Sequence, residues 1–207
     1  MRKLLPAAIA GIVCLLCASA AFAATLNGTD NDDTLFGTAG ADRITAKGGL
    51  DIVFGQSGND RINGGTGDDT LQGDAVCPTG SRNPDRCDQS RGTGNDIVDG
   101  GAGGDTMAGG RGNDTVRGGA GADNIQGGAG NDRIAGGSGV DAIFGQAGVD
   151  RITLGSGKDS ADAGAGNDTI FARDSEADTI TCGSGRDIAY VDRFDKASGC
   201  ESVRRSK

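Results

Sequence analysis

Apolar residues recur with a period of nine residues along most of the chain. Residues 28–171 divide into 16 units of nine, of which 14 are regular, and the eighth place is Leu, Ile, Val or Met in 13 of these. Places seven to nine are expected to alternate outward, inward and outward, as in a short strand. One apolar residue cannot make a core alone, so the units are expected to stack as an all-β solenoid. Two units complete a coil of 18 residues, and strands in successive coils lie parallel.

Two polar features keep the same phase. The fourth place is Gly in 13 of the 14 regular units, and the sixth place is Asp in all 14. Glycine permits the positive φ angles of a tight turn, so places one to six are expected to form the turn. The sixth-place aspartates then fall into two columns. The first column is Asp33, Asp51, Asp69, Asp105, Asp123, Asp141 and Asp159, and the second is Asp42, Asp60, Asp96, Asp114, Asp132, Asp150 and Asp168.

Two irregular segments divide the solenoid. Residues 73–90 lack the Asp and the apolar eighth residue, but their 18 residues equal one coil, so they can loop out without shifting either column. One extra residue near Ala172 precedes degenerate repeats with Asp178 and Asp187. The chain is therefore expected to hold N-terminal coils in 24–72, an insertion in 73–90, C-terminal coils in 91–171, and degenerate repeats with a cap in 172–207.

The first 23 residues have the pattern of a signal peptide. Arg2 and Lys3 precede an apolar stretch from Leu4 to Ala18, and Ala21-Phe22-Ala23 fits a cleavage site. Cleavage would leave Ala24 as the mature N-terminus; a retained membrane anchor is the alternative.

Export makes disulfides plausible for the four cysteines that remain, Cys77, Cys87, Cys182 and Cys200. Each irregular segment holds one pair, which favours bridges 77–87 and 182–200. Free or cross-paired thiols stay open as the alternative.

Composition narrows the function classes. The chain has 29 Asp and Glu, 20 Lys and Arg and no His, for a net charge of −9. Nucleic acid is disfavoured as a partner because phosphate binding needs a basic surface. Without His, zinc or copper sites and His-based acid–base catalysis lose their usual side chain.

The aspartate columns need a cation. Neighbouring coils lie about 4.8 Å apart, and unit charges at that distance repel. Carboxylates and the carbonyls of glycine turns are hard oxygen ligands, which select calcium over zinc or copper. Magnesium demands a stricter octahedron and keeps its waters. Multiple calcium ions are therefore expected.

The unit Gly-Gly-x-Gly-x-Asp-x-(Leu/Ile/Val)-x, as in Gly127–Ala135, resembles the RTX, or hemolysin-type, calcium-binding nonapeptide repeat over about residues 25–190. The resemblance implies a right-handed parallel β-roll with calcium ions between successive coils. Sixth-place Asp and backbone carbonyls would hold them, and Asp178 and Asp187 would join the 14 aspartates of the columns. The C-terminal segment, with Cys182 and Cys200, is similar to the end of secreted bacterial proteins of this type. An N-terminal signal peptide and the lack of an attached catalytic or pore-forming domain depart from the toxins and proteases of the family.

These observations indicate a secreted, extracellular, non-catalytic calcium-binding protein. A calcium-dependent adhesin or glycan-binding surface protein is the alternative, and an enzyme is the least favoured class. Phe36, Phe54 and Phe144 occupy outward ninth places; Phe36 and Phe54 are expected to stack, and packing of the sheet is favoured over a sticky patch. For the seventh-place arginines, charge compensation is favoured over ligand binding; these are Arg43, Arg61, Arg133 and Arg151.

Overall fold

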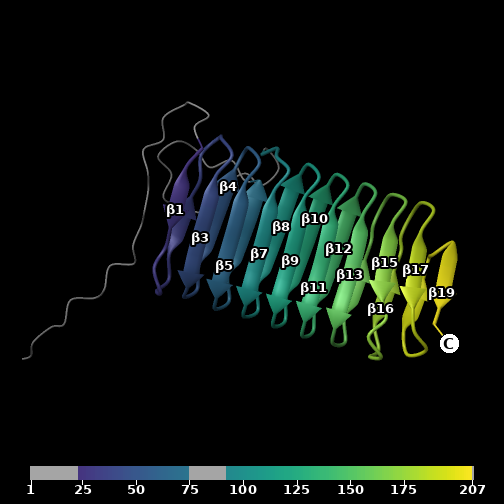
Figure 1. Cartoon of the computed structure of the whole chain (residues 1–207). Coiled ribbons are helices and arrows are strands. Elements are labelled where there is room, and N and C mark those ends of the chain that lie inside the picture. The colour runs from purple at the N-terminus through teal and green to yellow at the C-terminus, as the bar shows by residue number, and fades with distance from the viewer. Residues whose placement is uncertain (1–22, 75–91, 207) are drawn as a thin grey trace, which may run out of the picture.

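The computed structural model describes residues 23–74 and 92–206, which form a parallel β-solenoid (Figure 1). Its odd-numbered strands make one ten-stranded sheet. Their bounds are β1 Thr25–Asn27, β3 Arg43–Gly48, β5 Arg61–Thr66, β7 Ile97–Ala102, β9 Thr115–Ala120, β11 Arg133–Ser138, β13 Arg151–Ser156, β15 Thr169–Ala172, β17 Ile188–Val191 and β19 Ser202–Arg205.

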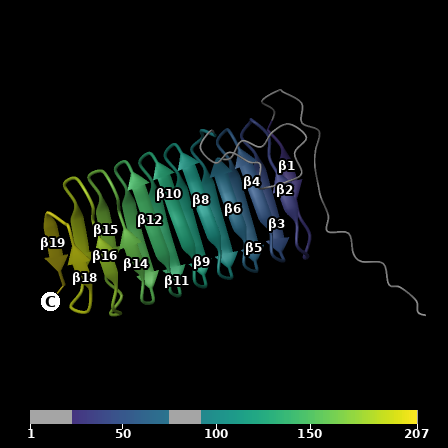
Figure 2. The same cartoon turned by 180° about the vertical axis from the view of Figure 1, so that it is seen from behind.

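The even-numbered strands make a second sheet of nine strands, seen from its own side in Figure 2. Their bounds are β2 Thr34–Phe36, β4 Ile52–Gln56, β6 Thr70–Asp74, β8 Thr106–Arg111, β10 Asn124–Ala129, β12 Ala142–Ala147, β14 Ser160–Asp162, β16 Thr179–Thr181 and β18 Lys196–Ser198. Strands alternate between the two sheets along the chain, so each coil contributes one strand to each sheet.

The register confirms the predicted coil. In the first sheet Ile134 of β11 lies opposite Ile152 of β13, which is 18 residues later. In the second sheet Ile125 of β10 lies opposite Ile143 of β12, with the same separation. The nine-residue period therefore places equivalent residues of alternate units side by side.

Both sheets continue in phase across the irregular segment. Ile62 pairs with Val98 and Leu71 pairs with Met107, each pair 36 residues apart. The sheets thus pass directly from the coils before the segment to the coils after it. Gly73 and Asp74 still belong to β6, two residues beyond the predicted end of the N-terminal coils. Cys77 and Cys87, with their predicted bridge, lie outside the described residues, as does the predicted signal peptide up to residue 22.

The strands are longer than the sequence pattern predicts. Nine of the 19 strands in the described chain run for six residues, from the seventh place of one unit to the third place of the next, as in β9 Thr115–Ala120. Places one to three were expected to lie in the turn. Instead the first-place Gly118 is buried inside the strand, so each unit has two inward positions rather than one.

The core is one continuous stack along the solenoid. Its eighth-place residues run from Leu26 to Ala189 and are buried. First-place side chains enter the same core near its two ends; they are Ala46, Leu154, Ala163, Ala172 and Cys182, followed by Val191 after the last unit. In the middle the first place is Gly, so the two sheets are separated there by a single layer of apolar side chains.

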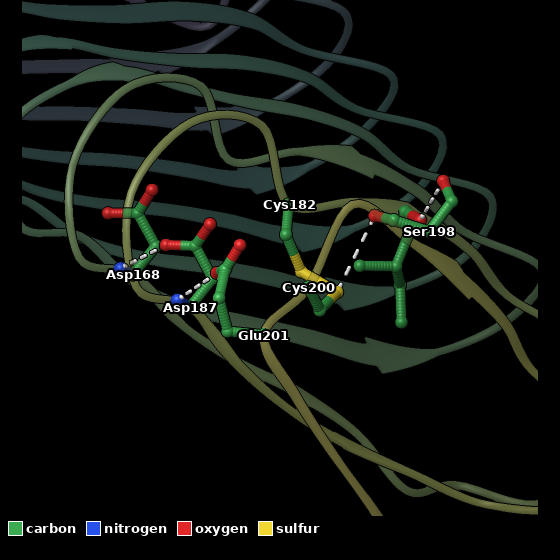
Figure 3. The surroundings of a disulfide bond; sticks show 7 residues. Asp168, Cys182, Asp187, Ser198, Cys200 and Glu201 are labelled. Carbon is green, nitrogen blue, oxygen red and sulfur yellow. Dashed lines mark hydrogen bonds between the residues drawn. A yellow bond between two sulfur atoms is a disulfide. The ribbon is translucent and has the colours of Figure 1, made fainter.

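The predicted bridge between Cys182 and Cys200 is present near the C-terminal end (Figure 3). Cys182 follows β16 and its N–H donates to the carbonyl of Ser198 at the end of β18. Its side chain belongs to the core, and Cys200 packs against that core. The disulfide therefore fastens the last coil to the one before it.

Aromatic residues on the outer faces pack within the sheets. Phe36 and Phe54 stack at 5.4 Å between ring centroids, as predicted. They are 7% and 3% exposed and form a small cluster of their own with Ile52, so they offer little free apolar surface. Phe144, by contrast, is 40% exposed. No helix in the described part of the chain is long and apolar enough to cross a membrane.

Candidate metal centre

The sixth-place aspartates form two continuous ladders along the solenoid. The backbone N–H of each donates to a carboxylate oxygen, Oδ1, of the aspartate one coil further on, at 2.7–3.0 Å. Asp105, for example, donates to Asp123, and Asp123 donates to Asp141. The ladders reproduce the two predicted columns, extended by Asp178 after Asp159 and by Asp187 after Asp168.

The turn geometry directs these carboxylates inward. Glycines in the second and fourth places have positive φ, as at Gly119 (116°) and Gly121 (141°), which turns the chain sharply before each aspartate. The aspartate then lies at the base of the strand with its side chain inside the coil. Asp123 is only 2% exposed, and every other aspartate of the two columns is equally buried.

Each ladder leaves one oxygen without a partner. In 15 of the 16 column aspartates, one buried carboxylate oxygen accepts no hydrogen bond; Asp42 is the exception. Buried polar atoms are normally paired, and a buried carboxylate without compensation is costly. Two rows of such oxygens, repeated once per coil, are what a row of cations between coils requires. The residues present therefore fit the multiple calcium ions that the sequence predicts.

Carboxylates alone do not complete these sites. Among the described residues, no three Asp, Glu, Cys or His side chains converge on one point. Calcium takes six to eight oxygen ligands, and backbone carbonyls are common among them. The carbonyls of the glycine-rich turns are the remaining oxygens close to each aspartate, so the donor set is one suited to calcium and not to a thiolate- or imidazole-seeking metal.

The N-terminal ends of the columns differ from the middle. The N–H and hydroxyl of Thr29 donate to Asp33, and those of Thr38 donate to Asp42. The N–H of Thr38 donates to Oδ2 of Asp42 and the hydroxyl of Thr38 donates to Oδ1, which also accepts the N–H of Ala24, so Asp42 has no free oxygen. These two aspartates are therefore partly or fully satisfied by protein groups.

The C-terminal ends are closed by residues that the repeat pattern does not identify. Asp195 accepts from the N–H groups of Asp178 and Asp192, and it ends the first column. Glu201 accepts from the N–H of Asp187 and ends the second column, beside the disulfide in Figure 3. Each residue directly precedes a strand, as a sixth-place residue does, in register with Asp178 or Asp187. The last coils are shortened, however, so the nine-residue period alone does not identify them.

A second polar ladder runs beside the columns. Fifth-place side chains accept from the backbone N–H one coil further on, as Asn95 does from Asn113 and Asn113 does from Asn131. This is the opposite direction to the aspartate ladder. The fifth-place ladder explains the repeated Asn-Asp pairs, which the sequence pattern left without a role.

Burial raises the pKa of 13 of the 16 column aspartates. The pKa of Asp96 rises to about 8 and that of Asp60 to about 7, chiefly through desolvation, while Asp60 and Asp96 also repel each other. Backbone hydrogen bonds oppose these shifts but do not cancel them. Without a cation, the folded protein therefore holds protons that the unfolded chain releases at the same pH.

These shifts predict that acid substitutes in part for the metal. The pKa values of these aspartates in the folded protein lie above the ordinary 3.8, so the metal-free chain takes up protons when it folds. The stability of the metal-free fold is therefore lost as the pH rises through the folded pKa values of about 6 to 8. We expect metal-stripped protein to gain β circular dichroism when the pH falls from about 8 to about 5. A spectrum that is unchanged, or less β-like, at the lower pH would contradict this prediction.

The comparisons with known proteins agree with the geometry. The model of the RTX calcium-binding nonapeptide repeat matches the chain at 27–62, 54–75, 92–116, 109–143, 117–152, 144–175 and 153–189. None of the curated proteins is similar to the chain in sequence. The family model covers most of the chain, both sides of the irregular segment and nearly the whole of both aspartate columns. The chain therefore belongs to the family of RTX calcium-binding nonapeptide repeats.

Proposed function

We propose that the chain is a secreted, non-catalytic calcium-binding protein whose two columns hold calcium ions between successive coils. The 15 unpartnered carboxylate oxygens carry this proposal. The ligands would be the sixth-place aspartates, Asp178 and Asp187, together with turn carbonyls. Bound calcium supplies the positive charge that stacked carboxylates need, while the chain's own turns set their spacing.

The expected calcium requirement and the pattern of the N-terminal segment support secretion. Extracellular calcium modules bind at about 10⁻⁴–10⁻³ M, a concentration that the cytoplasm does not offer. A chain of net charge −9 with ligands assembled only on folding would stay unfolded there, which suits export by a signal peptide. N-terminal sequencing of protein recovered from the medium should give Ala24 as the first residue. Protein that stays in the cells with residues 1–23 attached would contradict secretion.

The number of ions tests the proposed sites. Eight aspartates in each ladder leave seven gaps per column, which gives an estimate of 14 calcium ions for the regular ladders. Asp42 has no free oxygen, so the gaps at the N-terminal end are expected to fill last. Native mass spectrometry at saturating calcium should show many ions. One or two ions at saturation would defeat the proposal.

Replacing one mid-column aspartate tests the role of the ladder. Asp123→Ala removes a ligand from the gaps on both sides, so the calcium midpoint of folding should rise by roughly threefold or more. The exposed Asp162 on β14 stands outside both columns, and Asp162→Ala should leave the midpoint unchanged. Equal calcium midpoints for the two variants would show that the aspartate columns do not bind the calcium that drives folding.

One observation favours a second candidate function, binding of an acidic glycan. Arg43 lies opposite Arg61, and Arg133 lies opposite Arg151, on the outer face of the first sheet. Like charges side by side on neighbouring strands repel. Asp99 is the only acid in the strands of that sheet within the described chain, so the predicted charge compensation is sparse. Calcium-loaded protein should then bind acidic glycans more tightly than neutral ones. The double variant Arg43→Ala/Arg61→Ala should lose that preference.

A further inference from the structure

Asp74 is buried like the column aspartates but does not belong to the repeat. It ends β6 in the second place of its unit, where the next coils along the same sheet have Gly110 and Gly128. Its side chain is 3% exposed. A lone carboxylate at a second place therefore needs its own explanation.

The side chain of Asp74 takes the position of a backbone carbonyl. Elsewhere in this sheet the second-place Gly128 lies tightly against the carbonyl oxygen of Gly110, one coil earlier. Gly110 itself lies against the Cβ of Asp74 instead. Oδ2 of Asp74 accepts a hydrogen bond from the N–H of Arg111 at 2.9 Å, in the way that a backbone acceptor of the β-sheet would. A carboxylate thus stands at the turn where the other coils present a neutral carbonyl.

The second oxygen of Asp74 is left over. Oδ1 is buried and accepts no hydrogen bond. The charge of Asp74 raises the pKa of Asp60, Asp96 and Asp114, so it lies within electrostatic reach of three members of the second column. Pairing with the N–H of Arg111 requires only one neutral acceptor. The guanidinium of Arg111 attracts Asp74 and offsets part of its charge, but Oδ1 itself accepts no hydrogen bond. A buried carboxylate oxygen left in this way is costly unless a cation lies against it.

We propose that Asp74 is an additional calcium ligand of the second column, at the turn where its side chain lies against Gly110. This inference rests on the proposed function, that calcium fills the gaps of the columns. The nonapeptide repeat does not assign the residue, because its second place is a glycine. With one more negative ligand than its neighbours, this site binds calcium most tightly, and it does so beside the irregular segment of the chain.

Asp74→Asn separates the role of Asp74 as a calcium ligand from its role as the hydrogen-bond acceptor of Arg111. Asparagine keeps an oxygen for the N–H of Arg111 but loses the charge, so the variant should still fold at saturating calcium. In calorimetric titrations with calcium chloride, its tightest phase should weaken by roughly tenfold or more. Asp162→Asn removes an equal charge from the exposed face and should titrate like the wild type.

The outcomes distinguish the two proposals. A wild type that binds one or two ions at most refutes the proposed function. A wild type that binds many ions, with Asp74→Asn equal to it, refutes only the role of Asp74. If Asp74→Asn fails to fold, crystals of the calcium-loaded wild type decide the matter. An anomalous calcium peak at about 2.3–2.6 Å from an Asp74 oxygen supports the inference, and its absence overturns it.

Discussion

Removing calcium should unfold the solenoid completely at about pH 8. Each of the 15 unpartnered buried oxygens costs roughly 1–3 kcal/mol, whereas a folded domain is stable by only about 5–15 kcal/mol in total. The core cannot offset this, because it is a single layer of side chains through most of its length. Calcium binds the folded chain and not the unfolded one, so it stabilises the fold by mass action. Circular dichroism should be coil-like in excess chelator and β-like on adding millimolar calcium.

The shape of that transition is also informative. Adjacent gaps share an aspartate, as the gaps on either side of Asp123 do, so filling one orders a ligand of the next. The titration should therefore be steep and cooperative. Magnesium at the same concentration should leave the spectrum coil-like, because it keeps its waters and demands a stricter octahedron. A β spectrum that persists unchanged in chelator at this pH would show that the core is self-sufficient.

The period of the sequence was sufficient to predict the coil and the columns. An unbroken spacing of nine residues permits one stacking register, so the pairing of Ile134 with Ile152 and the alignment of Asp105, Asp123 and Asp141 could be derived beforehand. The predicted bridge between Cys182 and Cys200 is present. The prediction rested on the two cysteines sharing one irregular segment, and the pairing of β16 with β18 brings them into adjacent coils.

Features that depend on local backbone direction could not be predicted in the same way. The first-place glycines read as turn residues, yet Gly118 continues a strand because the chain bends only at Gly119 and Gly121. Asp195 and Glu201 close the columns from coils that have lost the repeat. Asp74 was assigned to the irregular segment because its unit lacks the sixth-place Asp. Its side chain nevertheless accepts the N–H of Arg111 in the next described coil.

The fourth-place glycines should be the least replaceable residues of the turns. Gly121 has φ of 141°, and a Cβ added there would overlap the carbonyl oxygen of Gly103 in the preceding coil. The second place is more tolerant, since Lys47, Gln56 and Gln146 occupy it with φ between 76° and 88°. No residue other than glycine has a positive φ at a fourth place in the described coils. The left-handed region is unfavourable for residues with a Cβ, and the overlap with backbone cannot be relieved by a rotamer change.

Gly121→Ala should therefore lower the free energy of unfolding by roughly 3–4 kcal/mol at saturating calcium, one of the largest effects expected of a single methyl group. Gly104→Ala is the matched control. Gly104 lies in the fifth place without a positive φ, and a Cβ there would be 3.1 Å from the nearest atom, the carbonyl oxygen of Ala122, so a small shift accommodates it. Urea denaturation of both variants measures the difference. Equal losses would mean that the turns adjust freely, and the spacing between coils would then be set by the bound calcium rather than by glycine.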